Sequence, residues 1–327
     1  MIILFILESS LRSVNVGPDT QGYYNDYNTI SGLSWSDIWG GFISSYQQGE
    51  GKDPGFVLFV KLVQALPGDF NFFLFVSALI FFIPLGLILY KYSTHSLQLV
   101  FAFTLYVALF HIVALSGIRQ QIATGLTFLA LYELGKGRMW RCILFIALGS
   151  IIHISALVFL LAPLLSLFNW RYLKPIHLGS FLTIPFVALN AGAILSITAS
   201  FLANDYYSAY GTGESTGEAF VYIILMELLS FFCYLAIKRD QLRDNPNVTL
   251  LYLMLPLLTV TVPLISLNGA MIRIGQYFTL YMMLLAPIAV DSLSRRTSRS
   301  GIYIIMIAAL IVLSLNSGSF HYSFFWQ

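Results

Sequence analysis

Long runs of apolar residues, separated by short polar connections, dominate the pattern of this chain. A helix needs roughly 20 apolar residues to cross a bilayer core about 30 Å thick. Runs of about that length cover residues 70–90, 97–118, 176–200, 219–237, 248–267 and 272–290, and shorter runs cover 119–135 and 302–315. The pattern predicts an all-α polytopic transmembrane protein with roughly 9–11 membrane helices, including short or re-entrant ones.

The N-terminal part of the chain follows a different pattern. The run from Ile2 to Leu7 is too short to span a membrane and lacks a basic flank, so we expect a clipped or misassigned start rather than a signal peptide. Residues 8–54 are too polar to insert and predict an outer loop. Segment 55–66 carries Lys61 in its middle and predicts a short interfacial helix.

The orientation of the spans follows from the basic connections, because Lys and Arg in short loops favour the cytoplasm. The acidic stretch 203–218 contains no Lys or Arg, so we expect it outside with segment 8–54. No internal repeat is visible, and residues 1–327 predict a single integral membrane domain. The basic residues assigned to the cytoplasm are Lys136, Arg138, Arg141, Lys238, Arg239, Arg243, Arg295, Arg296 and Arg299.

Residues 142–168 do not fit this count of spans. Basic residues flank the stretch on both sides, yet at 1.5 Å per residue it is too long for one untilted span and too short for two. Two half-helices meeting near Gly149 to His153 solve the problem, and broken helices at membrane depth line protein-buried or watery cavities. One long tilted span, with Arg171 and Lys174 outside, is the alternative.

Composition narrows the class of protein further. The chain is 58% hydrophobic and 10% charged, against about 25% charged in an average soluble domain, which excludes a soluble globular enzyme. A net charge of only +2 argues against a nucleic-acid-binding protein, because such proteins usually carry many excess Lys and Arg residues. The apolar runs do not alternate with a period of two, which excludes an outer-membrane barrel. Cys142 and Cys233 lie inside apolar runs and predict neither a disulfide nor a metal site.

Ionisable residues inside membrane spans are candidate functional residues, because their exposure to lipid costs several kcal/mol. Arg119 and Arg273 are both expected near the outer face at the start of a helix, where free N–H groups and the helix dipole favour an anion. Two such guanidinium groups suit a diphosphate. A snorkelling Arg119 and an ion pair of Arg273 with Glu227 or Glu218 are the alternatives. The residues concerned are His111, Arg119, Glu133, His153, Glu227, Arg273 and Asp291.

Further candidates come from His153 and from the outer segment. A lone histidine in an apolar helix is usually a satisfied interior residue, but the predicted break beside His153 favours a general base or phosphate ligand. Acidic and tyrosine side chains in the outer segment suit sugar recognition, whereas for Asp26 and Asp37 solvated loop acids are the alternative. These outer candidates are Arg12, Asp19, Tyr23, Tyr24 and Glu50.

Together these residues resemble the EpsG-like branch of the Wzy-type bacterial polysaccharide polymerases. The resemblance extends over nearly the whole chain, and its most specific part is the pair Ser116–Ala123 and His153–Ala156. It also includes Arg12 with Gly17–Thr20 and Tyr23 or Tyr24, Glu50 with Asp53–Phe56, and Arg273 with Tyr277 and Phe278.

The resemblance implies a glycosyltransferase of the GT-C type that uses undecaprenyl-diphosphate-linked repeat units. Its place would be the bacterial inner membrane, with the active site facing the periplasm or the outside. We expect Arg119 and Arg273 to bind the departing diphosphate with Arg12 assisting, and His153, Asp19 or Glu50 to act as base. Gln120, Tyr23, Tyr24 and Tyr277 complete the expected substrate site.

No cofactor or metal is expected, and a chain-length regulator or flippase is the expected kind of protein partner. Rival functions are an O-antigen ligase, which shares donor and compartment, and a lipid-linked oligosaccharide flippase, which would be expected to show pseudo-repeats. A membrane O-acyltransferase is disfavoured because His153 has no acidic neighbour in sequence.

Overall fold

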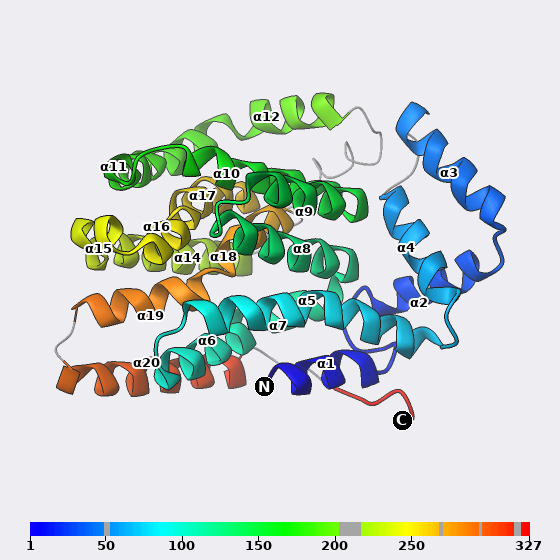
Figure 1. Ribbon diagram of the computed structural model, residues 1–327, viewed down its shortest axis with the longest axis horizontal. Coiled ribbons are helices and arrows are strands. Elements are labelled where there is room, and N and C mark those ends of the chain that lie inside the picture. The colour runs from blue at the N-terminus through cyan, green and yellow to red at the C-terminus, as the bar shows by residue number, and fades with distance from the viewer. Residues whose placement is uncertain (49–52, 203–216, 268–270, 294–295, 317–321) are drawn as a thin grey trace. The chain divides into compact units, whose positions relative to one another are not determined.

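The computed structural model consists almost wholly of helices (Figure 1). It describes residues 1–48, 53–202, 217–267, 271–293, 296–316 and 322–327. Within these residues the extended pairing is limited to an isolated bridge between Arg12 and Phe324. The predicted all-α class is therefore confirmed.

The chain divides into two compact units. The first comprises Met1–Lys91, Phe103–Leu157 and Ala308–Gln327, and the second comprises Tyr92–Ala102 and Val158–Ile307. Helices α5, α6, η1 and α20 each continue from one unit into the other. The single integral domain expected from the sequence stays a prediction.

The first unit contains the N-terminal helices and the pair formed by α8 and α9. Figure 1 shows α2, α3 and α4 gathered at the end of α5 where that helix begins. The helices are α1 (Ile2–Leu11), α2 (Thr20–Ser31), α3 (Trp35–Gln48), α4 (Pro54–Gln64), α5 (Phe70–Tyr92), α6 (Ser96–Leu109), α7 (His111–Ser116), α8 (Ile118–Leu134), α9 (Met139–Ile152) and η1 (Ile154–Leu160).

The second unit contains most of the C-terminal half of the chain, and several of its helices are short. They are α10 (Leu161–Ser166), α11 (Trp170–Ser180), α12 (Thr183–Leu202, kinked at Asn190), α14 (Gly217–Ala236), α15 (Arg239–Asp244), α16 (Pro246–Tyr252), α17 (Met254–Thr261), η3 (Val262–Ser266), α18 (Ile272–Thr279), α19 (Met282–Leu293) and α20 (Arg296–Asn316).

Three stretches of helix in the described residues are long and apolar enough to cross a membrane. A fourth joins Ile272–Thr279 and Met282–Leu293, which meet at a bend of 44°. Shorter apolar helices occupy most of the remaining apolar runs, as in α9 and α20. These lengths and compositions confirm a polytopic membrane protein. The three stretches are Phe70–Tyr92, Trp170–Leu189 and Pro246–Ser266.

Two predicted connections turn out to be helical. Segment 8–54, expected as an outer loop, forms α2 and α3, because buried Ile30 and Ile38 give these polar helices an apolar side to pack. The expected basic loop from Arg171 to Lys174 lies within α11, whose first turn is capped by Asn169. The interfacial segment 55–66 does form a helix, α4, while 203–216 lies outside the described residues.

The apolar core of the first unit surrounds α4. Residues from α2, α3, α5 and α8 pack against this helix, so the start of α4 and the start of α8 are held in one cluster. This packing positions the polar residues described below. The buried members are Ile30, Ile38, Phe56, Val60, Val63, Phe70, Phe73, Leu74, Ile118 and Ile122.

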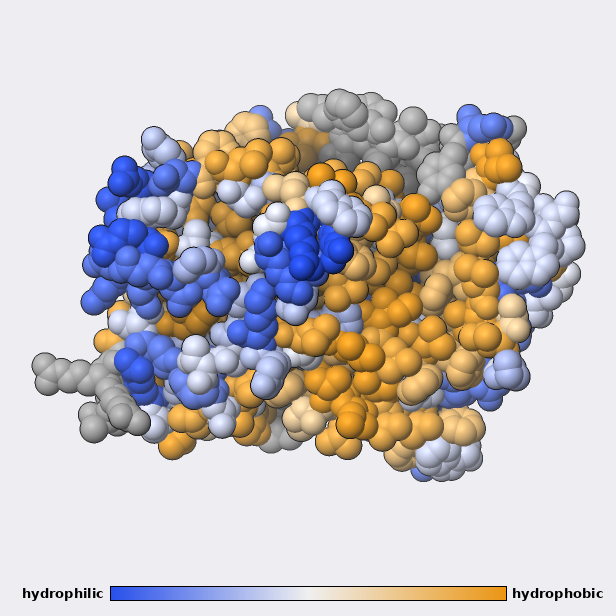
Figure 2. Space-filling view, viewed as in Figure 1, coloured by the Kyte–Doolittle hydropathy of each residue, from blue (hydrophilic) through white to orange (hydrophobic). Residues whose placement is uncertain are grey.

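Large apolar side chains also lie on the surface. Figure 2 shows that much of the visible surface is hydrophobic. On α9, for example, Trp140, Ile143, Leu144 and Leu148 are all more than two-fifths exposed. A soluble monomer rarely exposes contiguous apolar patches of this kind. The exposed apolar surface therefore fits contact with lipid.

Helix α8 lies unusually close to α5 at Gly125. A Cβ atom added there would collide with the backbone carbonyl of Ile80 and lie 2.8 Å from the Cα of Phe81. Because backbone cannot move aside as a flexible side chain does, Gly125→Ala should lower the free energy of unfolding by about 1–3 kcal/mol. Thermal unfolding in detergent measures the effect.

The matched control is Gly179→Ala in α11, where an added Cβ meets nothing within 4 Å. This substitution should leave the melting temperature unchanged or raise it slightly, because Ala is the better helix former. Equal melting temperatures for wild type and Gly125→Ala would contradict the close contact.

Candidate active site

The chain breaks at His153, between α9 and η1. Helix α9 ends at Ile152, and His153 has extended backbone angles, φ −154° and ψ 112°. The amide of His153 still donates to Gly149 O at 2.8 Å, while η1 begins at Ile154. The helix break expected near Gly149 to His153 is confirmed, and its re-entrant course stays a prediction.

Asp53 reaches this break because of the residues that follow it. Pro54 occupies the first turn of α4, where its fixed φ suits a helix start. Gly55 lets α4 approach the end of α9, because a Cβ there would lie 2.8 Å from the carbonyl carbon of Ile151. Asp53 itself has φ of +50°, a conformation that non-glycine residues seldom adopt. Such backbone strain often accompanies functional sites.

The Asp53 carboxylate joins α4 to the broken helix. Its Oδ2 atom lies 2.9 Å from His153 Nδ1, and its Oδ1 atom accepts a hydrogen bond of 3.3 Å from the amide of Ile154. Both side chains are almost completely buried. Burial by itself raises the pKa of Asp53, but the hydrogen bond from His153 and the charges of His153 and Arg119 outweigh it and lower the pKa. Asp53 is therefore ionised at neutral pH.

Arg119 supplies a positive charge at the same carboxylate. It lies in the first turn of α8, directly after the break at Gly117, as expected from the sequence. Its Nη1 atom lies 3.5 Å from Asp53 Oδ2, and its Nη2 atom donates to Asp26 Oδ2 at 3.2 Å. The side chain is 17% exposed, whereas that of Asp26 is 50% exposed. One of the two acidic partners is thus buried and the other faces solvent.

Aromatic rings hold the Arg119 guanidinium from another side. Its central carbon lies 4.7 Å from the Phe56 ring centre and 5.6 Å from that of Tyr23. The two rings pack edge to face against each other, so Tyr23 belongs to the cluster, as expected from the sequence. Arg119 Nε is buried without a hydrogen-bond partner among the described residues. An anion entering beside Arg119 would meet a donor that is still available.

Two other predicted substrate residues lie near this cluster in the fold. Gln120 is buried, and its Oε1 atom accepts a hydrogen bond of 3.4 Å from Ser155, just beyond the helix break. Tyr24 is 36% exposed and packs edge-on against Phe70. Gln120 therefore lies inside the protein, while Tyr24 presents an accessible ring.

Arg12 lies in the same unit but is almost completely enclosed. It is 1% exposed, and Nη1 donates to Ser9 at 2.9 Å. Its backbone is tied to the C-terminal segment through Phe324, and Asn71 donates to its carbonyl. This enclosure favours a structural charge at the end of α1. A direct contact of Arg12 with substrate stays a prediction.

The remaining predicted residues belong to other elements of the chain or lie outside the described residues. Asp19 begins α2, and Glu50 lies outside the described residues. Arg273 begins α18 as expected, and Tyr277 one turn later is completely buried, but both belong to the second unit. The joint action of Arg119 and Arg273 stays a prediction.

Several other ionisable groups are accounted for by local partners. In the first unit, Glu133 lies within 3.4–3.6 Å of Lys136, Arg138 and Arg141 at the turn after α8. His111 lies 2.9 Å from Glu8. These contacts are typical of structural charges.

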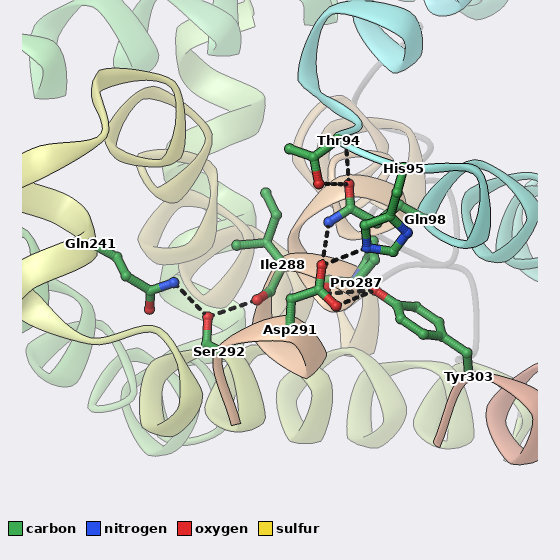
Figure 3. A network of polar contacts seen from close by, with 9 residues as sticks. All are labelled: Thr94, His95, Gln98, Gln241, Pro287, Ile288, Asp291, Ser292 and Tyr303. Atoms are coloured by element: carbon green, nitrogen blue, oxygen red, sulfur yellow. Dashed lines mark hydrogen bonds and ion pairs between the residues drawn. The ribbon is translucent and has the colours of Figure 1, made fainter. Parts of the chain in front are cut away.

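Asp291 in the second unit is similarly enclosed by partners. Figure 3 shows its carboxylate between His95, Gln98 and Tyr303, at 2.8, 2.7 and 3.2 Å. Gln98 in turn accepts a hydrogen bond from the Thr94 amide. This network ties the connection before α6 to α19 and α20, so we interpret Asp291 as structural.

Sequence reasoning overlooked two members of the cluster, Asp53 and Asp26. In the sequence, Asp53 stands out only as part of the Asp53–Phe56 pattern, and Asp26 only as an acid of the outer segment. The Asp-Pro-Gly pattern was the available signal in the sequence. Proline is typical of the first turn of a helix, and glycine lets another segment approach the backbone closely. No pattern of spacing links position 53 to position 153.

The arrangement resembles a histidine base held by an acid. In the neutral tautomer whose Nδ1 donates to Asp53, the Nε2 atom of His153 carries the lone pair and is able to accept a proton. The described residues contain no group of three or more His, Cys, Asp or Glu side chains placed to hold a metal ion. The site thus combines a candidate base with a guanidinium that lies beside two carboxylates.

The lowered pKa of Asp53 makes the fold sensitive to acid. Its contribution to stability is fully present above the unfolded pKa of about 3.9 and is lost as pH falls through the lower folded pKa. Asp53→Asn should lower the free energy of unfolding by roughly 2–3 kcal/mol at pH 7. The gap between variant and wild type should close as pH falls below about 4, as measured by thermal unfolding in detergent.

Asp240→Asn is the control, because Asp240 is 79% exposed and pairs with Arg243, which is also exposed. It should differ little from wild type at any pH. A constant gap for Asp53→Asn from pH 7 down to pH 3 would exclude the proposed role of the ionised carboxylate.

The family model described as EpsG family matches residues 1–326, which is nearly the whole chain. No curated protein and no solved structure matches the chain. A match of this extent, together with the helical membrane architecture, places the chain among polysaccharide polymerase-type membrane proteins: it belongs to the EpsG family.

Proposed function

We propose that this protein joins glycan repeat units carried on undecaprenyl diphosphate, at the outer face of the bacterial inner membrane. The observation that carries the proposal is the cluster in which His153 and Arg119 contact the same buried carboxylate, Asp53. Transfer of a glycan from a diphosphate needs a base for the acceptor and a positive charge for the leaving group. The cluster offers both.

The reaction we propose is a displacement at the anomeric carbon of the donor. His153 Nε2 takes the proton from the acceptor hydroxyl, whose oxygen forms the new glycosidic bond. The bond between the anomeric carbon and the diphosphate oxygen breaks, and the lipid diphosphate leaves with the electron pair. Asp53 stabilises the imidazolium ion that forms, without taking the proton itself.

Arg119 stabilises the negative charge that develops on the leaving diphosphate. Charge stabilisation of this kind is often the largest single contribution to catalysis. The exposed carboxylate of Asp26 is the partner that a diphosphate would displace, because ion pairs at solvent-exposed positions contribute only about 0–1 kcal/mol. Arg273 is the proposed second guanidinium. Arg12 is the proposed assisting cation, and Asp19 and Glu50 are the alternative bases.

The proposed orientation has a geometric basis within the first unit. Arg119 begins α8, and the basic turn with Lys136 and Arg138 follows its end. The helix has 17 residues, so these two groups lie about 25 Å apart along its axis. If the basic turn faces the cytoplasm, as basic loops tend to do, Arg119 faces the outside.

Polymerisation of purified lipid-diphosphate repeat units by the reconstituted protein tests the proposal. Wild type should give a ladder of lengthening lipid-linked glycans, and Arg119→Ala and His153→Ala should each slow its formation by about 100-fold or more. Arg119→Lys should be intermediate, because lysine keeps the charge but not the two-pronged geometry. Gel electrophoresis of the products provides the measurement.

Arg138→Ala is the matched control for arginine loss, since Arg138 lies beyond the opposite end of α8 and is 47% exposed. It should keep wild-type activity. A wild-type protein that forms no ladder but moves labelled lipid across the vesicle would favour a flippase. Transfer of a finished glycan to lipid A core, without elongation, would favour a ligase.

Removal of the competing carboxylate should strengthen donor binding. Asp26→Asn leaves Arg119 with one acidic partner, so the KM for the lipid-linked donor should fall by up to about fivefold while kcat stays unchanged. Asp240→Asn is the control, because Asp240 is an exposed acid that pairs with Arg243 instead. A rise in KM for Asp26→Asn would contradict the displacement of Asp26 by the diphosphate.

A further inference from the structure

A polar cavity of about 340 Å³ lies among α2, α3 and α4, and no role described so far uses it. Its volume falls within the range of small-molecule sites. All of its walls belong to the first unit. The lining residues are Tyr27, Ser31, Trp35, Lys61, Gln64 and Ala65.

We propose that this cavity binds a sugar unit of the glycan, and that the bound sugar is uncharged or acidic. The inference rests on the proposed function for its biological meaning. The binding chemistry itself depends only on the lining residues.

The polar groups of the cavity are held in place but retain unused hydrogen-bonding capacity. Gln64 Nε2 donates to the carbonyl of Tyr27 at 2.7 Å, which fixes the amide, while Oε1 is buried without a partner among the described residues. Lys61 Nζ donates to the carbonyls of Ile30 and Ser31 at 3.3 and 3.2 Å. A third ammonium hydrogen remains. A fixed acceptor and a fixed donor suit sugar hydroxyl groups.

Two aromatic residues complete the cavity. Tyr27 is held edge-on against Phe70 at 5.6 Å, so its ring is rigid before any ligand binds. Trp35 begins α3 and is 43% exposed. Hydrogen bonds between Ser34 and Asp37 fix this helix start. The C–H face of a pyranose ring packs well on such an aromatic surface, and rigid aromatic side chains lose little entropy on binding.

The charge of the cavity narrows the ligand class. Lys61 is its charged lining residue, and the described lining residues include no acid to balance it. A cationic amino sugar would therefore be repelled, whereas a neutral sugar or one bearing a carboxylate or phosphate would be accepted. This gives the cavity a selectivity that its shape alone would not provide.

The cavity lies within reach of the proposed reaction centre. Asp53 precedes the first turn of α4, and Lys61 follows on the same helix eight residues later, about 12 Å along the axis. A glycan with one end at His153 would extend over this distance. The cavity is thus placed to hold a sugar removed from the reacting one.

Binding of the free repeat-unit oligosaccharide, released from both lipid and diphosphate, tests the inference. The purified full-length protein in nanodiscs serves as receptor, and saturation-transfer NMR and calorimetry provide the readouts. Trp35→Ala and Gln64→Ala should each weaken binding tenfold or more. Trp35→Phe should retain most of the affinity, because it keeps an aromatic face. This variant also separates loss of the ring from loss of folding.

Trp39→Ala is the matched control. Trp39 lies one turn later on α3, is 49% exposed and does not line the cavity. It should bind as wild type does. Equal affinities for all variants, loss of binding in Trp39→Ala equal to that in Trp35→Ala, or binding of glycerol phosphate in preference to the oligosaccharide would each overturn the inference.

The two proposals fail in different ways. If wild type polymerises lipid-linked units but Trp35→Ala neither weakens oligosaccharide binding nor changes product length, the sugar site is wrong and the polymerase proposal survives. If wild type binds the oligosaccharide through Trp35 but forms no polymer, the sugar site survives and the polymerase proposal is wrong.

Discussion

The contacts of the Asp53 carboxylate are the constraint on which the candidate site depends. One buried acid accepts hydrogen bonds from the ring of His153 and the amide of Ile154, and it lies beside the guanidinium of Arg119. A buried charge without such partners costs several kcal/mol, so the carboxylate and its partners require one another. The left-handed backbone of Asp53 and the close approach at Gly55 are the local costs of bringing the acid there.

Other polar clusters of the protein differ from this one in a way that helps to assign roles. His177, in the second unit, has both ring nitrogens occupied, by Tyr252 at 3.0 Å and Ser230 at 2.9 Å, and it is fully buried. Asp291 is likewise bonded on both carboxylate oxygens (Figure 3). Such closed networks stabilise helix packing. Arg119, by contrast, combines a solvent-facing acidic partner with an Nε atom that has no hydrogen-bond partner among the described residues.

Membership of the EpsG family and the geometry of the candidate site are independent observations, and both are consistent with a polymerase. The family match covers nearly the whole chain and gives the polymerase-type role. The geometry shows which described residues are placed to do chemistry. It also separates Arg119, which is partly exposed among aromatic rings, from Arg12, which is enclosed at the end of α1.

The sequence by itself determined the helical membrane class, the helix starts at Arg119 and Arg273, and the break beside His153. These features depend on local composition, run length and glycine or proline positions, which act over a few residues. It also led to an outer loop where α2 and α3 are found, because polar composition argues against insertion but not against a helix.

Only the tertiary structure decided which residues meet. Asp53 and His153 are 100 residues apart, and Arg119 and Asp26 are 93 apart. Their contacts depend on apolar packing of α4 against α2, α5 and α8, and on a glycine at position 55 that admits the end of α9. Packing of this kind is a collective property of distant segments, so no local pattern in the sequence records it.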